Sequence, residues 1–152
     1  MTADAPETDV LQLVLAANAA RRAGDASGGA AGLALEHTFA CAERLASYGS
    51  LAPGGQNHGV LAACPGTWWQ GVVTGFRAAR DWPVFTFAPN GPPVPVQVLH
   101  SRALPAHWPT IDAFEGTDYR RILVPVWQGE LLTWVANLYE AVDPVAPPPR
   151  AP

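Results

Sequence analysis

Apolar residues near the start of the chain recur at the spacing of one helix face. Within Glu7–Ala23 this face carries Val10, Leu11, Val14, Leu15 and Asn18. Acidic residues begin the segment and Arg21-Arg22 close it, which suits the dipole of a helix. The pattern therefore predicts an amphipathic helix. The following residues, Gly24–Gly32 (GDASGGAAG), have the composition of a flexible linker.

Short runs rich in β-branched and aromatic residues follow, separated by Gly and Pro, and they predict β-strands. The runs are Arg44–Tyr48, Gly71–Arg77, Val84–Phe87, Val94–Leu99, Arg121–Trp127 and Glu130–Tyr139. The last two flank Gln128-Gly129 and predict a hairpin. Pro95 lacks a backbone N–H, so we expect its strand to have an edge or a bulge there.

One further segment, Leu104–Phe114, returns to helical spacing. Its apolar residues are Leu104, Trp108, Ile111 and Phe114. Gly116 follows as a stop signal, so the segment predicts a helix with one buried face.

Together these elements predict an α+β chain in three parts. A helical extension and Gly-rich linker occupy residues 1–32, a small, mostly antiparallel domain occupies residues 33–142, and a Pro-rich tail occupies residues 143–152. The extension helix must bury its apolar face, either on the domain or in self-association with a second chain, and the sequence leaves the oligomeric state open.

The charge composition argues against two classes of binding partner. Of 152 residues, 49% are hydrophobic and only 14% are charged, against a usual charged share of about 25%. Nine basic residues, all arginine, face 13 acids, which gives a net charge of -4. This balance argues against nucleic acid and against a polybasic membrane contact.

The two cysteines, Cys41 and Cys64, are too few for a disulfide scaffold. The acidic N-terminus does not have the pattern of a signal peptide, and apolar runs are too short for a membrane span. We therefore expect a reduced, cytoplasmic protein.

A Gly-rich loop after the first strand is the first candidate for chemistry. It runs from Ser47 to His58 and begins Tyr48-Gly49-Ser50-Leu51. Consecutive backbone N–H groups in such a loop can hold an anion or a carbonyl oxygen. An ordinary turn is the alternative interpretation, and for this segment alone it is the commoner one.

Glu115, at the end of the Leu104–Phe114 helix, is the second candidate. A helix C-terminus disfavours negative charge, so a carboxyl group there retains its proton more readily. Partial burial acts in the same direction. Such a carboxyl suits general acid–base chemistry at neutral pH, whereas the alternative is a solvated acid in a helix-end loop.

In this order, the two segments resemble the γ-glutamylcyclotransferase-like superfamily, in particular its AIG2-like and γ-glutamylamine cyclotransferase branches. The resemblance covers about residues 42–141. Its residues are Tyr48-Gly49-Ser50-Leu51, His58, Asp112, Phe114-Glu115-Gly116, Tyr119, and Arg121 or Arg120, with supporting matches at Gly66-Thr67-Trp68, Gly71, Trp82-Pro83-Val84 and Ala136–Tyr139.

The resemblance implies a small, partly closed β-barrel with flanking helices. It implies that Glu115 is the general acid/base in the cyclisation of a γ-glutamyl group to 5-oxoproline, which releases an amine or amino acid. Tyr48, Gly49, Ser50 and Leu51 would hold the γ-glutamyl group, mostly through backbone amides, and Tyr119 would orient it. The substrate would be a small γ-glutamyl compound, and no cofactor or metal would be needed.

Two departures from the family pattern keep a second interpretation open. The central strand reads Val94–Val98 without the Gly-Glu pair that family members usually carry, and the first strand is unusually polar. A non-catalytic module on the same scaffold, binding a small molecule or a protein, is therefore the alternative to an enzyme.

Other polar and aromatic residues are weaker candidates. His37, Cys41, His58 and Cys64 lack the spacing of a metal site. One of Trp68 and Trp82 could line a pocket, and Tyr139 could do so or belong to the core. Arg120-Arg121 could bind a carboxylate, although neighbouring residues of a strand point to opposite faces.

Overall fold

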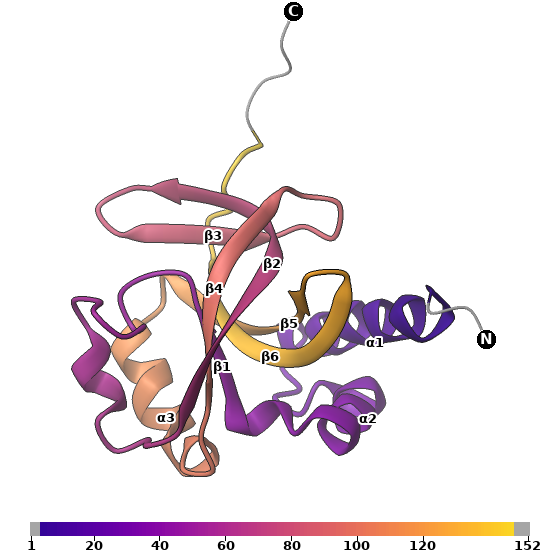
Figure 1. Cartoon of the computed structure of the whole chain (residues 1–152), viewed down its shortest axis with the longest axis horizontal. Helices are drawn as coiled ribbons and strands as arrows, with labels where there is room; N and C mark the ends of the chain where they lie inside the picture. The colour runs from indigo at the N-terminus through magenta and orange to yellow at the C-terminus, as the bar shows by residue number, and fades with distance from the viewer. Residues whose placement is uncertain (1–3, 148–152) are drawn as a thin grey trace, which may run out of the picture.

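The computed structural model describes residues 4–147, which form three α-helices, two 3₁₀ turns and six β-strands (Figure 1). The helices are α1 (Asp4–Arg22), α2 (Gly29–Phe39) and α3 (Leu104–Glu115). The strands are β1 (Arg44–Ser47), β2 (Thr67–Ala79), β3 (Pro83–Phe87), β4 (Pro93–His100), β5 (Tyr119–Gln128) and β6 (Leu131–Ala141). The 3₁₀ turns are η1 (Cys41–Glu43) and η2 (His58–Leu61).

Five strands close into a barrel. Their order is β2-β4-β1-β6-β5, and the pair Val72↔Trp127 joins β5 back to β2. Only β1 and β6 run parallel, while β3 pairs with β2 outside the ring. The expected α+β class with a mostly antiparallel barrel is confirmed, and the ring is closed rather than partly closed.

Alternating residues of these strands fill the barrel with Ala, Val, Ile and Leu side chains. Phe85 of β3 is fully buried in the same cluster, beside Val73, Val124 and Leu138. Gly71 leaves room for the opposite wall, because a Cβ there would lie 2.5 Å from Val126 Cγ1.

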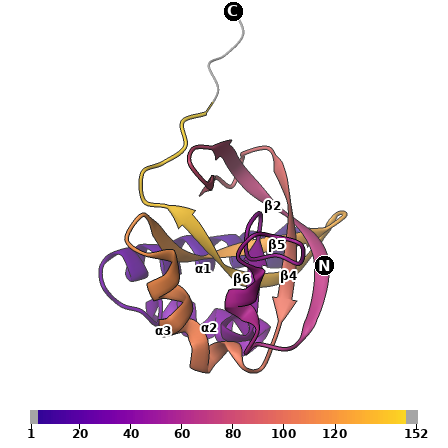
Figure 2. The same ribbon diagram turned by 90° about the vertical axis from the view of Figure 1, so that its left-hand side faces the viewer.

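The helix α3 covers one outer face of the barrel, as Figure 2 shows. Leu104, Trp108 and Ile111 are buried there against the outward face of β1 and β4. The expectation that Phe114 completes this face is wrong: its side chain is 48% exposed, because the last turn of the helix extends past the apolar cluster. Gly116, at φ 75°, ends the helix as expected.

The helix α1 packs across β5 on another side of the barrel (Figure 1). Val14 and Ala17 are fully buried in this contact. The Asn18 side chain donates to the carbonyl of Leu123 and accepts from its N–H, both at 2.8 Å. These paired bonds fix the helix to the middle of a strand, so most of the apolar face is buried within the same chain. The expectation that Leu15 belongs to the buried face is wrong, because its side chain is 39% exposed.

The expectation of a flexible linker over Gly24–Gly32 is wrong in its second half, because α2 begins at Gly29. The glycines here allow positive φ angles and close packing of the backbone. Gly28 and Gly29 have φ of 79° and 66°, and a Cβ on Gly32 would lie 2.0 Å from the Ser27 carbonyl oxygen. The division of the chain at residue 32 stays a prediction, and residues 148–152 of the predicted tail lie outside the described residues.

The remaining sequence predictions on β4 and the cysteines have simple outcomes. β4 pairs with β2 along its length but with β1 only through Gln97–His100, so Pro95 has a neighbouring strand on one side alone, as expected. Cys41 and Cys64 are buried and unbonded to each other. Among the described helices, none is long and apolar enough to cross a membrane.

Candidate functional site

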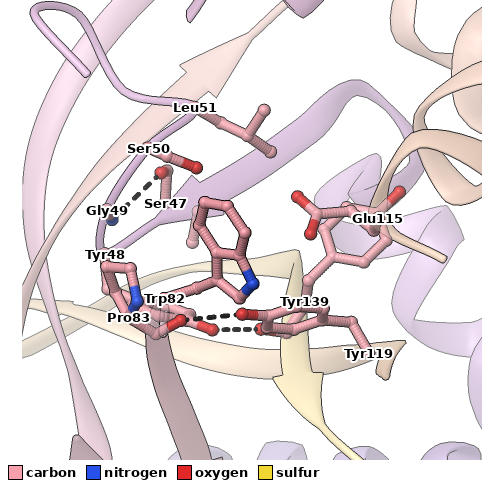
Figure 3. Close-up of a pocket in the computed structure, with 11 residues that line it drawn as sticks. Ser47, Tyr48, Gly49, Ser50, Leu51, Trp82, Pro83, Glu115, Tyr119 and Tyr139 are labelled. Atoms are coloured by element: carbon pink, nitrogen blue, oxygen red, sulfur yellow. Dashed lines mark hydrogen bonds between the residues drawn. The ribbon is translucent and has the colours of Figure 1, made fainter. Parts of the chain in front are cut away.

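A small pocket opens where the loop after β1 meets the end of α3 (Figure 3). It encloses about 40 Å³. Its walls are Ala46, Ser47, Tyr48, Gly49, Ser50, Leu51, Trp82, Pro83, Glu115, Tyr119 and Tyr139. The structure thus brings together all six residues that the sequence singled out as a site, although they lie on separate segments of the chain.

Tyr48 anchors the loop to the barrel. Its hydroxyl donates to the carbonyl of Tyr139 at 2.8 Å, and its ring lies 5.4 Å from that of Phe85. Just beyond it, Gly49 N–H donates to Ser47 Oγ at 3.3 Å, and the carbonyl of Gly49 accepts from Ala52. These bonds hold the backbone of the loop in one path along the pocket.

The next two residues of the loop supply unoccupied donors. The N–H groups of Ser50 and Leu51 donate to no protein group among residues 4–147. The carbonyl of Ser50 is used, because it accepts from Asn57 at 2.8 Å. Two successive free N–H groups beside a pocket are suited to an oxyanion or a carboxylate.

Glu115 brings a carboxyl group without a partner into this pocket. It is the last residue of α3, and its carboxyl makes no hydrogen bond or ion pair with the described residues. Burial, together with the charge of Asp112 one helical turn earlier, raises the pKa of Glu115 to about 7. A carboxyl with this pKa can both accept and donate a proton near neutral pH.

Two tyrosines complete the wall opposite the loop. Tyr119 lies at the start of β5, and its hydroxyl donates to the carbonyl of Pro83 at 2.9 Å. The Tyr139 hydroxyl donates to Asp112 Oδ1 at 2.6 Å. Since both hydroxyl protons are engaged by the protein, each phenol oxygen can still accept a hydrogen bond from a ligand.

Trp82 and Pro83 also belong to the pocket, where the sequence gave Trp82 only as one of two possible lining residues. Trp82 is 58% exposed in the turn before β3. Trp68, the other possibility, lies 5.7 Å from the ring of His58, away from the pocket. The signal that could have found both residues was the aromatic-Pro pair itself.

Comparison with solved structures identifies the architecture, whereas no protein-family model and no curated protein matches the sequence. An AIG2-like protein of Mus musculus superposes with a TM-score of 0.51 and 20% identity, covering 69% of this chain and 80% of its own. An uncharacterised protein of Pyrococcus horikoshii gives the same TM-score and identity, covering 67% and 80%. The chain has the γ-glutamylcyclotransferase-like fold.

Within this γ-glutamylcyclotransferase-like barrel, the remaining polar candidates serve the protein itself. His58 Nδ1 lies 2.9 Å from the carbonyl of Leu51 and braces the loop. Arg120 pairs with Glu140 at 2.8 Å, and Arg121 binds both oxygens of Asp112, at 2.9 and 3.3 Å. Both arginines that the sequence offered for a substrate carboxylate are therefore bonded to protein carboxylates. Among residues 4–147, no three His, Cys, Asp or Glu side chains group as a metal site.

Proposed function

We propose that this protein is a γ-glutamyl cyclotransferase, with Glu115 as its general acid/base. The observation that carries the proposal is an unpartnered carboxyl with a pKa of about 7 in the same pocket as two free loop N–H groups. The fold is shared with an AIG2-like protein, which supports a reaction of this type.

The reaction needs one proton carrier and one oxyanion site. The Glu115 carboxylate takes a proton from the α-ammonium of a γ-glutamyl compound. The freed amine attacks the γ-carbonyl carbon, and its oxygen receives the electron pair. As the oxygen returns that pair, the bond to the leaving nitrogen breaks and Glu115 gives this nitrogen the proton. The ring nitrogen still carries one proton more than the lactam needs. Glu115, again a carboxylate, takes this second proton and passes it to the released amine, which leaves as an ammonium ion. The products are 5-oxoproline and an amine or amino acid.

The loop has two tasks in this reaction. The N–H groups of Ser50 and Leu51 stabilise the charge that develops on the γ-oxygen or hold the substrate's carboxylate. Tyr48 keeps the loop in place, and Tyr119 offers an acceptor to the substrate. Because the nucleophile and the carbonyl belong to one molecule, positioning accounts for much of the rate. The reaction as written uses no cofactor.

The test is the release of 5-oxoproline from a panel of γ-glutamyl amines, γ-glutamyl peptides and glutathione. We expect wild-type protein to release 5-oxoproline from at least one class, and Glu115→Gln to release it far more slowly. No release from any member, or equal rates for the two proteins, would contradict the proposal.

A second candidate function is a non-catalytic binding module, and the size of the pocket favours it. A space of about 40 Å³ holds roughly three ordered waters, since one water needs about 10–15 Å³. A γ-glutamyl group is larger than this space, so for catalysis it must extend into a neighbouring cavity, such as the one that meets the pocket at Ser47–Gly49. If Glu115→Gln binds γ-glutamyl compounds as well as the wild type and neither turns them over, the module is the better account.

A further inference from the structure

Arg21, at the end of α1, is a part-buried cation that lacks an anionic partner. Its Nη1 donates to Asn137 Oδ1 at 2.8 Å and to the carbonyl of Arg121 at 3.4 Å. Its Nε is fully buried without a partner, and its Nη2 has none among the described residues. No carboxylate within residues 4–147 lies within 4.0 Å of this guanidinium.

The neighbouring charges leave the cation uncompensated. Arg121 lies beside Arg21, but Asp112 already neutralises it through two hydrogen bonds. Burial, together with the positive charge of Arg121, lowers the pKa of Arg21 to about 10, while Cys41, Asp112 and Glu36 act more weakly in the opposite sense. A buried charge without a partner costs free energy, which a bound anion would offset.

Space for a ligand lies beside this guanidinium. Two cavities of about 280 Å³ each are lined by Arg21, Ala26 and Arg121. Each is also lined by one acidic residue, Glu36 in the first and Asp112, which is bonded to Arg121, in the second. The second cavity also reaches Tyr119 and Tyr139, which line the candidate pocket as well. The cleft beside Arg21 is therefore a neighbour of the proposed catalytic site.

A third cavity borders the same site on its other side and has a different chemistry. It measures about 820 Å³ and meets the candidate pocket at Ser47–Gly49. The amide side chains of Gln70, Gln97 and Gln128 line it, and no charged side chain does. A carboxylate would find no cation there, so of these two neighbouring spaces only the Arg21 cleft suits an acid.

We propose that the Arg21 cleft is a subsite for a carboxylate, to which the N-terminal helix contributes the guanidinium. The planar fork of an arginine matches the two oxygens of a carboxylate. The inference rests on the proposed function, because it names the substrate class: γ-glutamyl amino acids or peptides rather than γ-glutamyl amines. The carboxylate arrives either on the leaving amino acid or as a free small acid.

A matched pair of substrates separates these two sources. γ-Glutamylglycine and γ-glutamylmethylamine differ only in the carboxylate of the leaving group. We expect Arg21→Gln to lower kcat/KM for γ-glutamylglycine about 10- to 100-fold, as for loss of a hydrogen bond to a charged group, and to change γ-glutamylmethylamine less than about twofold. Arg22→Gln, an exposed arginine on the same helix turn, is the control and should change neither.

Acetate binding, measured by calorimetry, tests the subsite without any turnover. Wild type and Arg22→Gln should bind acetate and Arg21→Gln should not, with Arg21→Lys retaining partial binding as a charge-preserving variant if Arg21→Gln does not fold. Loss of acetate binding without substrate discrimination would support the free-acid source. Equal acetate binding by Arg21→Gln and wild type, without substrate discrimination, would overturn the subsite. If no protein releases 5-oxoproline, the proposed function fails, and the acetate result still decides the subsite.

Discussion

Glu115 and Glu140 are both buried at least in part, but only Glu140 has hydrogen-bond and ion-pair partners within residues 4–147. Glu140, on β6, is 4% exposed, and its oxygens accept from Arg120 Nε at 2.8 Å and from the N–H of Phe87 at 3.0 Å. Glu115, at the end of α3, is partly buried and has no such partner among the described residues. One carboxylate ties three strands together, while the other is left available.

The difference shows what burial does with and without compensation. At Glu140, a cation and a backbone N–H replace the water that burial removed, and these bonds are part of the barrel. At Glu115, burial is not offset, and the pKa rises to about 7. A carboxyl group that is costly to ionise is the one suited to exchange protons at neutral pH.

The largest effect is expected at Glu115 itself. Replacing it with Gln removes the proton carrier and keeps the size of the side chain, so kcat for 5-oxoproline release should fall about 10²- to 10⁴-fold. Glu130→Gln, at the exposed hairpin turn, is the control and should keep the wild-type rate. A loss of less than tenfold in Glu115→Gln would contradict the role of Glu115 as the proton carrier.

Glu140→Gln should instead reduce stability. The side chain of Glu140 is only 6% exposed, and the change leaves Arg120 without its carboxylate partner. We therefore expect a loss of about 2 kcal/mol in the free energy of unfolding. Urea unfolding measures it. Asp143→Asn, which breaks an exposed ion pair with Arg80 at 3.6 Å, should cost less than about 0.5 kcal/mol. Equal losses for both variants would contradict the structural role of Glu140.

The pH dependence of stability gives a smaller effect with a definite sign. In the unfolded chain Glu115 ionises near pH 4.5, whereas in the folded protein it holds its proton to about pH 7. Stability from this group is therefore full below pH 4.5 and is lost as the pH rises to about 7. Thermal melts across this range should show the wild type losing stability relative to Glu115→Gln. If the two proteins lose stability in parallel across this pH range, burial does not raise the pKa of Glu115.

Tyr48→Phe should have the smallest effect. It removes the hydrogen bond to the Tyr139 carbonyl and keeps the ring contact with Phe85, so the expected loss is about 1 kcal/mol of stability. If that bond positions the loop, KM should rise as well. Thermal melts and steady-state kinetics on the same preparation measure both quantities, and an unchanged KM would show that the ring alone positions the loop.

The sequence predicted the strands and α3 well, because each has a local signal. Leu104, Trp108 and Ile111 recur at helical spacing, and Gly116 marks the helix end. The residues Tyr48–Leu51 and Glu115 could be joined only through their order in the chain and the family resemblance. That resemblance implied a barrel, and the structure places both segments at one pocket.

The rest depended on contacts that no local pattern encodes. The whole of α2 (Gly29–Phe39) was missed. Its first residues resemble a linker, because glycines that serve positive φ and close packing look like glycines that serve flexibility. Phe114 has the spacing of a buried residue, yet the barrel does not extend to cover it. The unpaired state of Arg21 depends on where Asp112 and Arg121 meet, which only the folded chain determines.

The most direct test of the account compares two titrations of one protein. One follows the Glu115 carboxyl by ¹³C NMR, assigned by its absence in Glu115→Gln, and the other follows kcat/KM for 5-oxoproline release against pH. Since kcat/KM reports ionisations of the free enzyme, we predict that its rising limb and the Glu115 signal share a midpoint near pH 7. A Glu115 midpoint near pH 4.5, or a rate that does not follow Glu115, would contradict the account.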